Sequence, residues 1–382
     1  MSERSGFDRV RNFANLVGLG GISPRTAAND ERWNFVSTKV LIVNPCQGGY
    51  GGIEAFILAV AEAVRREPDF EVRICLKRSK GAKLQPDLKA MFKGEDVILC
   101  DWVDRDLIQA VRWADLVHLQ NASLDVALLA KLFRKPLVLT IHHHRGREQN
   151  AYRLLRRFAV RIADERWYNS QFVWDTWEPH RKRPGSRKVP TVSKLPEGWT
   201  LPNERRGFVF IGVWIANKGI DTLVDAYALA QLDPEKWPLV LMGEGPLRRL
   251  IEYAIQRREI RGIDVLGFVD EATKADRIKN ARWMVVPSKR KEGFGLTAVE
   301  ARNLGVPCII TRDGGLPEAG GRQALICEPG DPRALARLLQ EAAAMSETEY
   351  AERATRTRAE LATELEPMEF YARAYRRIAH GK

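Results

Sequence analysis

The sequence lacks the features that mark an exported or membrane-spanning protein. Its 382 residues contain no apolar run long enough to cross a bilayer. Residues 1–6 do not show the basic-then-apolar order of a secretory signal. The few cysteines stand in apolar segments without C-x-x-C spacing, which is typical of reduced core residues: Cys46, Cys75, Cys100, Cys308 and Cys327. We therefore expect a cytoplasmic location.

Patterns of metal ligands are also missing. His142, His143 and His144 follow a predicted strand, but neighbours in an extended chain point to opposite faces, so the three cannot bind one ion. No second cluster of Cys, His or carboxylate residues in the sequence completes a site. Asp104 and Asp106 begin a predicted helix over 107–113, where Asp104 caps and Asp106 favours the positive end. We expect no metal requirement.

What the chain does have is a surplus of positive charge, a formal net charge of +12. Such a surface suits nucleic acid, anionic lipid or an acidic substrate, and composition alone does not separate these partners. Between 145 and 161 six arginines interleave with apolar residues at helical spacing, and a second basic stretch covers 180–188. The helix is either a solvated face or a contact with an anionic membrane surface or acceptor.

Strand and helix patterns alternate along the chain, which predicts an α/β fold with parallel sheets covered on both faces. Buried strands are expected at 39–44, 72–76, 97–100, 116–119, 137–141 and 166–169, then at 208–212, 239–242, 265–269 and 283–287. Pro, Gly and charged residues over 195–206 mark a linker. The predicted parts are an extension over 1–38 and two domains over 39–197 and 198–365, with a last helix that starts at Ser346.

One stretch, 285–318, organises this pattern. A predicted strand runs into a loop with Gly293 and Gly295, and the helix that begins at Leu296 turns its N-terminus, which attracts anions, toward that loop. Glu292 in the loop and Glu300 in the helix can both face the crevice beyond the strand's carboxyl end. An anion site beside two carboxylates suits a ligand with phosphates and hydroxyls, such as a nucleotide sugar. The alternative is two incidental glutamates on a solvated helix face.

The wider pattern P-S-x3-E-G-F-G-L-x3-E-A-x2-L-G-x-P over 287–307, followed by Asp313-Gly-Gly-Leu-Pro-Glu318, resembles the donor-binding segment of retaining glycosyltransferases of family 4. The resemblance implies a GT-B architecture, two Rossmann-like doubly wound domains facing one another across a cleft. The C-terminal domain would hold a nucleotide-sugar donor, and the N-terminal domain a glycan, lipid-linked or other small acceptor. It also implies retaining, metal-independent hexosyl transfer without a cofactor, and a C-terminal helix, about 366–382, that packs back on the first domain.

The resemblance also assigns catalytic roles to three residues. Glu292 would accept hydrogen bonds from the donor sugar, and Lys218, in a turn similar to the family's G-R-x4-K-G element, would neutralise the diphosphate. His142, in the pattern T-x-H, would contact the donor sugar. One departure stands out, because Val213 replaces the arginine that follows Gly212 in the family.

Other family positions imply donor binding. Glu300 would accept from the ribose, and the backbone of Phe268 and Val269 would line the base pocket. Glycine-rich turns and the loop before the helix would approach the donor closely, through Gly51, Gly52, Gly212, Gly243, Gly245, Gly293, Phe294, Gly295 and Leu296.

Two rival functions stay open at this level. A sugar-nucleotide epimerase of the same fold would turn over donor without an acceptor. A binding protein without catalysis would use the basic face on nucleic acid or lipid, and Val213 favours this reading. The transferase is our prediction, with a cytoplasmic location that includes peripheral contact with the inner face of the cell membrane, and nucleic acid is not an expected partner.

Overall fold

The computed structural model describes residues 37–46, 48, 51–78, 83, 85–101, 103–146, 151–192 and 194–381. Residues 1–36 of the expected extension over 1–38 lie outside these ranges, as do residues 47, 49 and 50 of the first glycine-rich turn and Arg147 of the basic segment.

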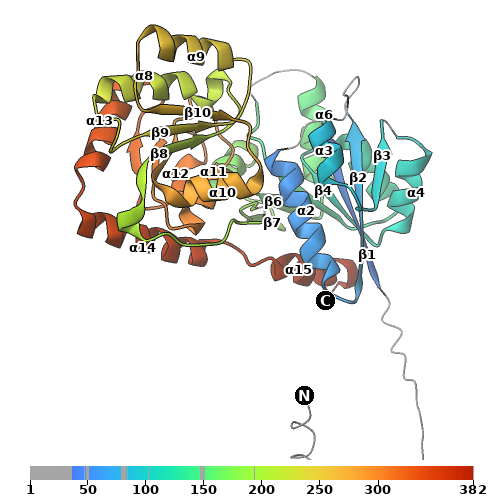
Figure 1. Ribbon diagram of the computed structural model, residues 1–382. Helices are drawn as coiled ribbons and strands as arrows, with labels where there is room; N and C mark the ends of the chain where they lie inside the picture. Colours follow the sequence, from blue (N-terminus) through green and yellow to red (C-terminus); the bar gives the residue numbers. More distant parts are fainter. Residues whose placement is uncertain are drawn as a thin grey trace, which may run out of the picture. The chain divides into compact units, whose positions relative to one another are not determined.

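The N-terminal half is built on a parallel sheet of seven strands, in the order β3-β2-β1-β4-β5-β6-β7 (Figure 1). Its strands are β1 (Thr38–Cys46), β2 (Phe70–Arg78), β3 (Val97–Cys100), β4 (Leu116–Gln120), β5 (Leu137–Ile141), β6 (Glu165–Tyr168) and β7 (Ser186–Lys188). The chain reverses its direction of progress between β1 and β4, which pair with Val40 opposite Leu116. Ligands of doubly wound sheets bind at such a switch point.

The C-terminal half repeats this plan with six parallel strands, in the order β10-β9-β8-β11-β12-β13. They are β8 (Arg206–Ile211), β9 (Leu239–Met242), β10 (Ile263–Gly267), β11 (Ala281–Val286), β12 (Cys308–Thr311) and β13 (Leu325–Cys327). Its switch point lies between β8 and β11. The predicted strand at 265–269 is shifted, because Gly267 adopts a φ of +69° and ends β10 two residues earlier.

Helices connect the strands and cover both sheets. Those of the N-terminal half are α2 (Gly52–Arg65), α3 (Pro86–Met91), α4 (Arg105–Trp113), α5 (Leu124–Leu132), α6 (Ala151–Ile162) and α7 (Gln171–Trp177). Those of the C-terminal half are η1 (Pro202–Glu204), η2 (Ala216–Lys218), α8 (Ile220–Ala230), α9 (Arg248–Arg257), α10 (Glu271–Asn280), α11 (Leu296–Asn303), α12 (Leu316–Gly320), α13 (Pro332–Ala344) and α14 (Glu347–Glu364).

Burial explains why these segments form strands. Val40, Leu41, Ile42 and Val43 of β1 are all fully buried, because successive side chains enter the two cores on opposite faces of the sheet. The capping role of Asp104 is confirmed, since its carboxylate accepts from the Leu107 backbone N–H at 2.9 Å. This bond satisfies one of the free donors at the start of α4.

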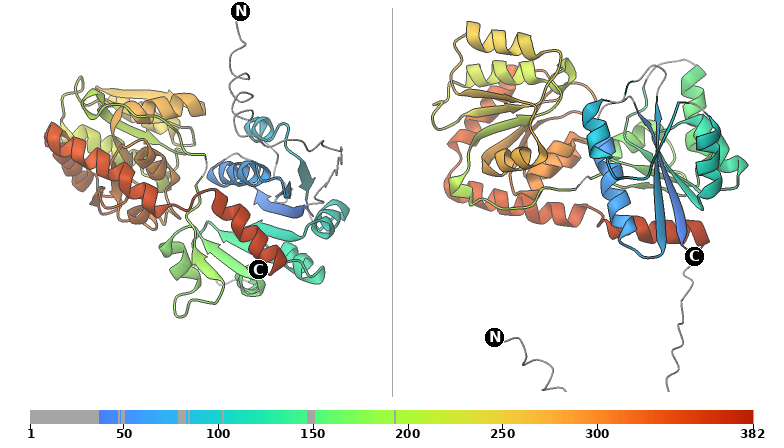
Figure 2. Two further views of the ribbon diagram at one scale, coloured as in Figure 1. Left: turned by 90° about the horizontal axis from the view of Figure 1, so that it is seen from below. Right: turned by 45° about the vertical axis from the view of Figure 1, so that its right-hand side comes forward.

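The end of the chain forms two helices where the sequence suggested one from Ser346. A break at residues 365–368, which includes Pro367, separates α14 from α15 (Glu369–His380). Helix α14 packs on α11 of the C-terminal half, whereas α15 lies beside α2 of the N-terminal half (Figure 2). Phe370, Tyr371 and Tyr375 of α15 belong to the core between the N-terminal sheet and α2.

Candidate active site

Most of the residues predicted to bind a donor lie in the loops at the switch point of the C-terminal sheet and after the neighbouring strand β9. The loop after β8 carries Gly212 to Lys218, and the loop after the neighbouring strand β11 leads to Glu292 and α11. Because the two strands are parallel and adjacent, both loops leave the same edge of the sheet.

Lys218 and Glu292 meet between these loops. The Lys218 ammonium lies 2.5 Å from Glu292 Oε2, and the Ser288 hydroxyl approaches the same oxygen at 3.3 Å. Both charged side chains are partly exposed. The structure thus places a cation and a hydrogen-bond acceptor side by side, which is the pair of groups that a sugar diphosphate needs.

Asp313 fixes the loop that carries Glu292. Its carboxylate accepts the backbone N–H groups of Lys291 at 2.7 Å and of Glu292 at 2.8 Å. The Glu292 carbonyl in turn accepts the Gly315 N–H at 2.9 Å. Gly314 must be a glycine, since a Cβ there would lie 2.0 Å from that carbonyl oxygen. The second loop of the sequence pattern therefore supports the first.

The loop ends at the N-terminus of α11 without a side-chain cap. Gly295 occupies the N-cap with a φ of +107°, which favours glycine, while Phe294 is buried in the core of the half and Leu296 is half-buried at the first helical position. With no side chain accepting them, the first N–H groups of α11 are available to an anion.

Glu300 lies in the second turn of α11 and is 3% exposed. Its Oε1 accepts from the Lys274 ammonium at 3.1 Å, but its Oε2 is buried and has no hydrogen-bond partner among the described residues. Burial raises the pKa of this carboxyl, against the opposing effect of Lys274. A buried acceptor without a donor is costly. A ligand hydroxyl is the group that would complete it.

Glycines after β8 and β9 let the two loops approach each other closely. A Cβ on Gly243 would lie 1.9 Å from the Gly212 carbonyl oxygen, and one on Gly245 would lie 2.7 Å from the Trp214 backbone. Side chains there would force the loops after β8 and β9 apart. Val213 beside them is 55% exposed, so the position departing from the family faces outward.

Phe268 and Val269 follow the end of β10. The Phe268 side chain is 72% exposed and Val269 is half-buried. The structure thus places them in the loop after the strand next to β9, on the same edge of the sheet.

His142 follows β5 in the N-terminal half. Its ring is buried, with Nε2 2.9 Å from Gln120 Oε1, and packs edge-on against Phe56. Burial holds the pKa of His142 well below its ordinary value, so the ring is neutral at physiological pH. Its neighbour His143 also has a lowered pKa, caused first by burial and then by the charge of Arg156.

In the N-terminal half, the end of the glycine-rich turn lies against the first residue of α11. Gly51 is the N-cap of α2, and a Cβ on Gly52 would lie 3.5 Å from a Leu296 methyl group. Close by, Glu54 is buried and accepts from the Asn44 amide at 2.9 Å. Burial raises the pKa of Glu54.

Contacts with His142 and α7 join the two halves. A Cβ on Gly293 would lie 2.4 Å from the His142 carbonyl oxygen, so only glycine fits at this approach. The Ser170 hydroxyl donates to the Gly293 carbonyl at 2.6 Å. Glu318 accepts the Phe172 N–H at 3.2 Å and pairs with Lys188 at 3.1 Å.

Sequence reasoning missed three of these residues. Asp313 belonged to the recognised D-G-G loop but was assigned no role, and its position two residues after β12 was the available signal. Lys274 and Ser170 act through tertiary contacts with Glu300 and Gly293, and nothing in their local sequence indicates this. Within the described ranges, no group of three or more His, Cys, Asp or Glu residues could hold a metal ion.

Two parallel doubly wound sheets, with the last helix on the first of them, define the GT-B architecture, and solved structures bear this out. The chain resembles Anabaena HepE, crystallised with UDP and glucose, with a TM-score of 0.71 over 88% of this chain and 98% of that one at 18% identity. At that identity the likeness is one of fold.

Residues 192–359 match the family model for glycosyl transferases group 1. One relative, an uncharacterised glycosyltransferase of Methanocaldococcus jannaschii, is 34% identical over 33% of this chain and 35% of its own length. Another, a GDP-mannose:cellobiosyl-diphosphopolyprenol alpha-mannosyltransferase of Xanthomonas oryzae, is 26% identical over 54% of this chain. The matches span about a third to three fifths of these relatives' lengths, 35% and 58%.

Proposed function

We propose that the protein is a retaining glycosyltransferase that moves a sugar from a nucleotide-sugar donor to a hydroxyl of a glycan, lipid-linked or other small acceptor. The observation that carries the proposal is the group formed by Lys218, Glu292 and Glu300 at the switch point between β8 and β11. A diphosphate would meet the ammonium, the sugar would meet Glu292, and a ribose hydroxyl would satisfy the unpaired Oε2 of Glu300. The named activities of the relatives support this reading.

The leaving diphosphate would be stabilised without a metal or cofactor. Lys218 supplies a fixed cation, and the uncapped N-terminus of α11 supplies oriented N–H groups and the positive end of its dipole. In transfer, the bond from the sugar C1 to the phosphate oxygen breaks as the acceptor oxygen forms the new bond to C1. The acceptor proton passes to the departing phosphate, which serves as the base.

This route retains the anomeric configuration because attack comes from the face that the phosphate leaves. Glu292 is paired with Lys218 and is assigned to binding the sugar, and no other carboxylate is assigned as a nucleophile. Proton NMR of the first product tests the route, and an inverted anomer would contradict it.

The acceptor side is proposed to work at the inner face of the cell membrane, from the cytoplasm. Helix α6 exposes Leu154, Leu155 and Phe158 beside its arginines, as a helix at an anionic lipid surface does. Among the described helices, none is both long and apolar enough to cross a membrane.

A thermal-shift screen with UDP-, GDP-, ADP- and dTDP-sugars tests the donor site directly. A ligand at 100 times its dissociation constant adds roughly 2.7 kcal/mol of stability. We expect one base to stabilise the wild type strongly and Lys218→Ala to lose most of that gain. No stabilisation by any of the four would overturn the proposal, and donor turnover without an acceptor would identify an epimerase instead.

A further inference from the structure

A second pocket lies wholly within the N-terminal half. It has a volume of about 650 Å³ and is bounded by α6, the end of α7 and the loop from Glu178 to Pro184. None of the donor-binding residues described above lines it. We call it the α6–α7 pocket.

Positive charge dominates the lining of the α6–α7 pocket. It includes Arg145, Arg157, Arg181, Lys182 and Arg183, against a single carboxylate, Glu178. For Arg157, Arg181 and Arg183, the described parts of the chain provide no carboxylate within ion-pair distance. The pocket therefore presents three guanidinium groups that are not neutralised by described acids.

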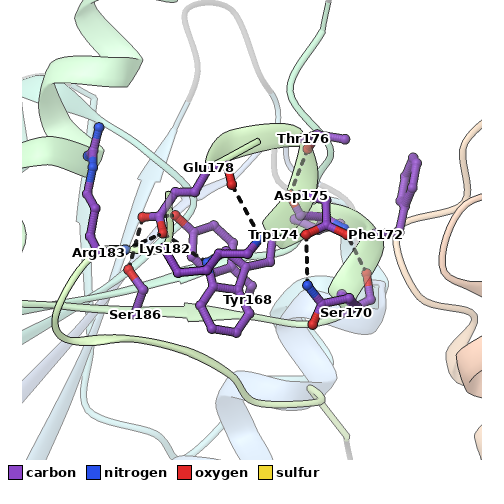
Figure 3. Close-up of polar contacts among 12 residues, drawn as sticks. Tyr168, Ser170, Phe172, Trp174, Asp175, Thr176, Glu178, Lys182, Arg183 and Ser186 are labelled. Atoms are coloured by element: carbon purple, nitrogen blue, oxygen red, sulfur yellow. Dashed lines mark hydrogen bonds and ion pairs between the residues drawn. The ribbon is translucent and has the colours of Figure 1, made fainter. Parts of the chain in front are cut away.

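Glu178 does not neutralise these guanidinium groups, because its carboxylate is already hydrogen-bonded on the buried side of the pocket lining. Its carboxylate, in a side chain 1% exposed, accepts from Trp174, Tyr168, Ser186 and the Arg183 backbone at 2.9–3.1 Å. The buried guanidinium of Arg166 lies 3.7 Å away. These bonds hold the basic loop in place, while the side chain of Arg183 extends away from the cluster (Figure 3).

The pocket adjoins both apolar surface and the reaction centre. On α6, Leu154 and Phe158 lie next to Arg157 on the helix surface and are 63% and 48% exposed, and Leu155 beside them is 47% exposed. On the inner side, the Trp177 indole N–H, from the pocket wall, donates to the His143 carbonyl at 2.9 Å. The pocket wall thus contacts His143, the residue that directly follows His142.

We propose that the α6–α7 pocket binds the phosphate or diphosphate group of a lipid acceptor, with the lipid chain lying on Leu154, Leu155 and Phe158. Guanidinium groups match phosphate oxygens in planar, two-point hydrogen bonds, which favours phosphate over a neutral sugar head. The adjacent apolar residues favour a phosphate borne by a lipid over a free one. This inference rests on the proposed transferase function and names the class of its acceptor.

The test measures binding of farnesyl diphosphate, farnesol and inorganic pyrophosphate to the full chain by calorimetry. We expect farnesyl diphosphate to bind at least about tenfold more tightly than either partial ligand, since it engages both surfaces. The double variant Arg181→Gln/Arg183→Gln should weaken it by about tenfold or more through loss of charged contacts.

The matched control is Arg333→Gln/Arg337→Gln, which removes the same charge from exposed positions of α13 in the other half. It should bind like the wild type. Equal weakening in both double variants would mean general charge attraction and would overturn the proposal, as would unchanged binding in the pocket variant. Because all four positions are exposed, thermal unfolding should confirm that every variant is folded.

A second pair of changes tests the lipid. Leu154→Ser/Phe158→Ser should reduce farnesyl diphosphate binding to the level of pyrophosphate and leave pyrophosphate itself unchanged. Equal binding of pyrophosphate and farnesyl diphosphate by the wild type would point to a free phosphate ligand and overturn the lipid assignment. None of these measurements uses a nucleotide, so a chain that binds farnesyl diphosphate but no nucleotide sugar would refute the transferase function and not the pocket.

Discussion

The two halves of the molecule share one topology but differ in the features that we propose bind their ligands. In the C-terminal half the proposed donor site is made of backbone turns and short motifs, and this half carries most of the residues matched by the family model. In the N-terminal half the distinctive groups are side chains. This half holds five of the 6 histidines and the basic residues that line the α6–α7 pocket. The sixth, His380, lies in α15, and its ring nitrogen contacts Thr38 of β1 at 2.9 Å. A donor common to a family leaves a common pattern, whereas an acceptor leaves features particular to one chain.

Glu292→Gln should give the largest effect. Turnover should fall roughly a hundredfold, because a charged acceptor on the transferred sugar contributes on the order of 1.5–3 kcal/mol. Affinity for the free nucleoside diphosphate should stay within about twofold of wild type, since the contact lies on the sugar. Calorimetry with the diphosphate and turnover with the full donor separate the two. Unchanged turnover would mean that the Glu292 carboxylate only pairs with Lys218 and does not bind the sugar.

His142→Ala tests whether the N-terminal half contributes to the same step. We expect turnover to fall roughly tenfold to a hundredfold by loss of one sugar contact, with little change in nucleotide affinity. His144→Ala is the control two residues along, with its ring 6.0 Å from Phe172. A large loss of turnover in His144→Ala, with none in His142→Ala, would assign the sugar contact to His144 instead.

Glu300→Gln should weaken nucleoside diphosphate and nucleotide sugar alike, by roughly tenfold. The reason is that its buried Oε2 is assigned to the ribose, which both ligands share. Competition binding with the two ligands would show the effect. Weakening of the sugar nucleotide alone would exchange the roles of Glu292 and Glu300.

Acid should destabilise the protein through the N-terminal half. Buried His118, bonded to Tyr375 and Thr140, has its pKa lowered to about 3 by burial, from an ordinary 6.5. Between these values the unfolded chain binds a proton that the folded chain does not, so stability falls as pH drops below about 6.5, by at most about 1.4 kcal/mol per unit. Urea unfolding at pH 7 and 5 should show a smaller loss in His118→Gln. An equal loss in both would assign the acid sensitivity to other groups.

Val213→Arg should have the smallest effect, a tightening of nucleoside diphosphate binding by a few fold. Position 213 is about half exposed, and charged contacts at such sites contribute roughly 0.2–1 kcal/mol. The control is Val213→Gln, of similar length without charge. Weaker binding in the arginine variant would show that the turn after β8 does not face the diphosphate.

The sequence predicted the fold well because its strands are continuous apolar runs. Segments 97–100 and 137–141 match β3 and β5 residue for residue, and the glycine-rich turns locate the switch points. The end of β10 was misjudged, because a left-handed Gly267 ends the strand within a longer apolar pattern. The continuous helix expected from Ser346 was also wrong, whereas the C-terminal helix expected at about 366–382 corresponds to α15. Whether the donor residues act as assigned stays a prediction.

What the sequence could not reveal is pairing across distance. Lys274 is 26 residues from Glu300, and Ser170 is 123 from Gly293. The α6–α7 pocket likewise depends on how Glu178 is satisfied, by groups of β6, α7 and β7. The sequence located basic residues at 145–161 and 180–188, and the packing shows that members of both stretches line one pocket.

The placement of α15 orders events during synthesis. Tyr375 hydrogen-bonds to His118 at 2.6 Å, and Arg376 donates to Asp69, so the first core of the chain is completed by some of its last residues. Domains generally fold in order as they leave the ribosome. Here α15 follows all strands of the C-terminal sheet in the sequence, so the residues that complete the core beside α2 are synthesised after that sheet.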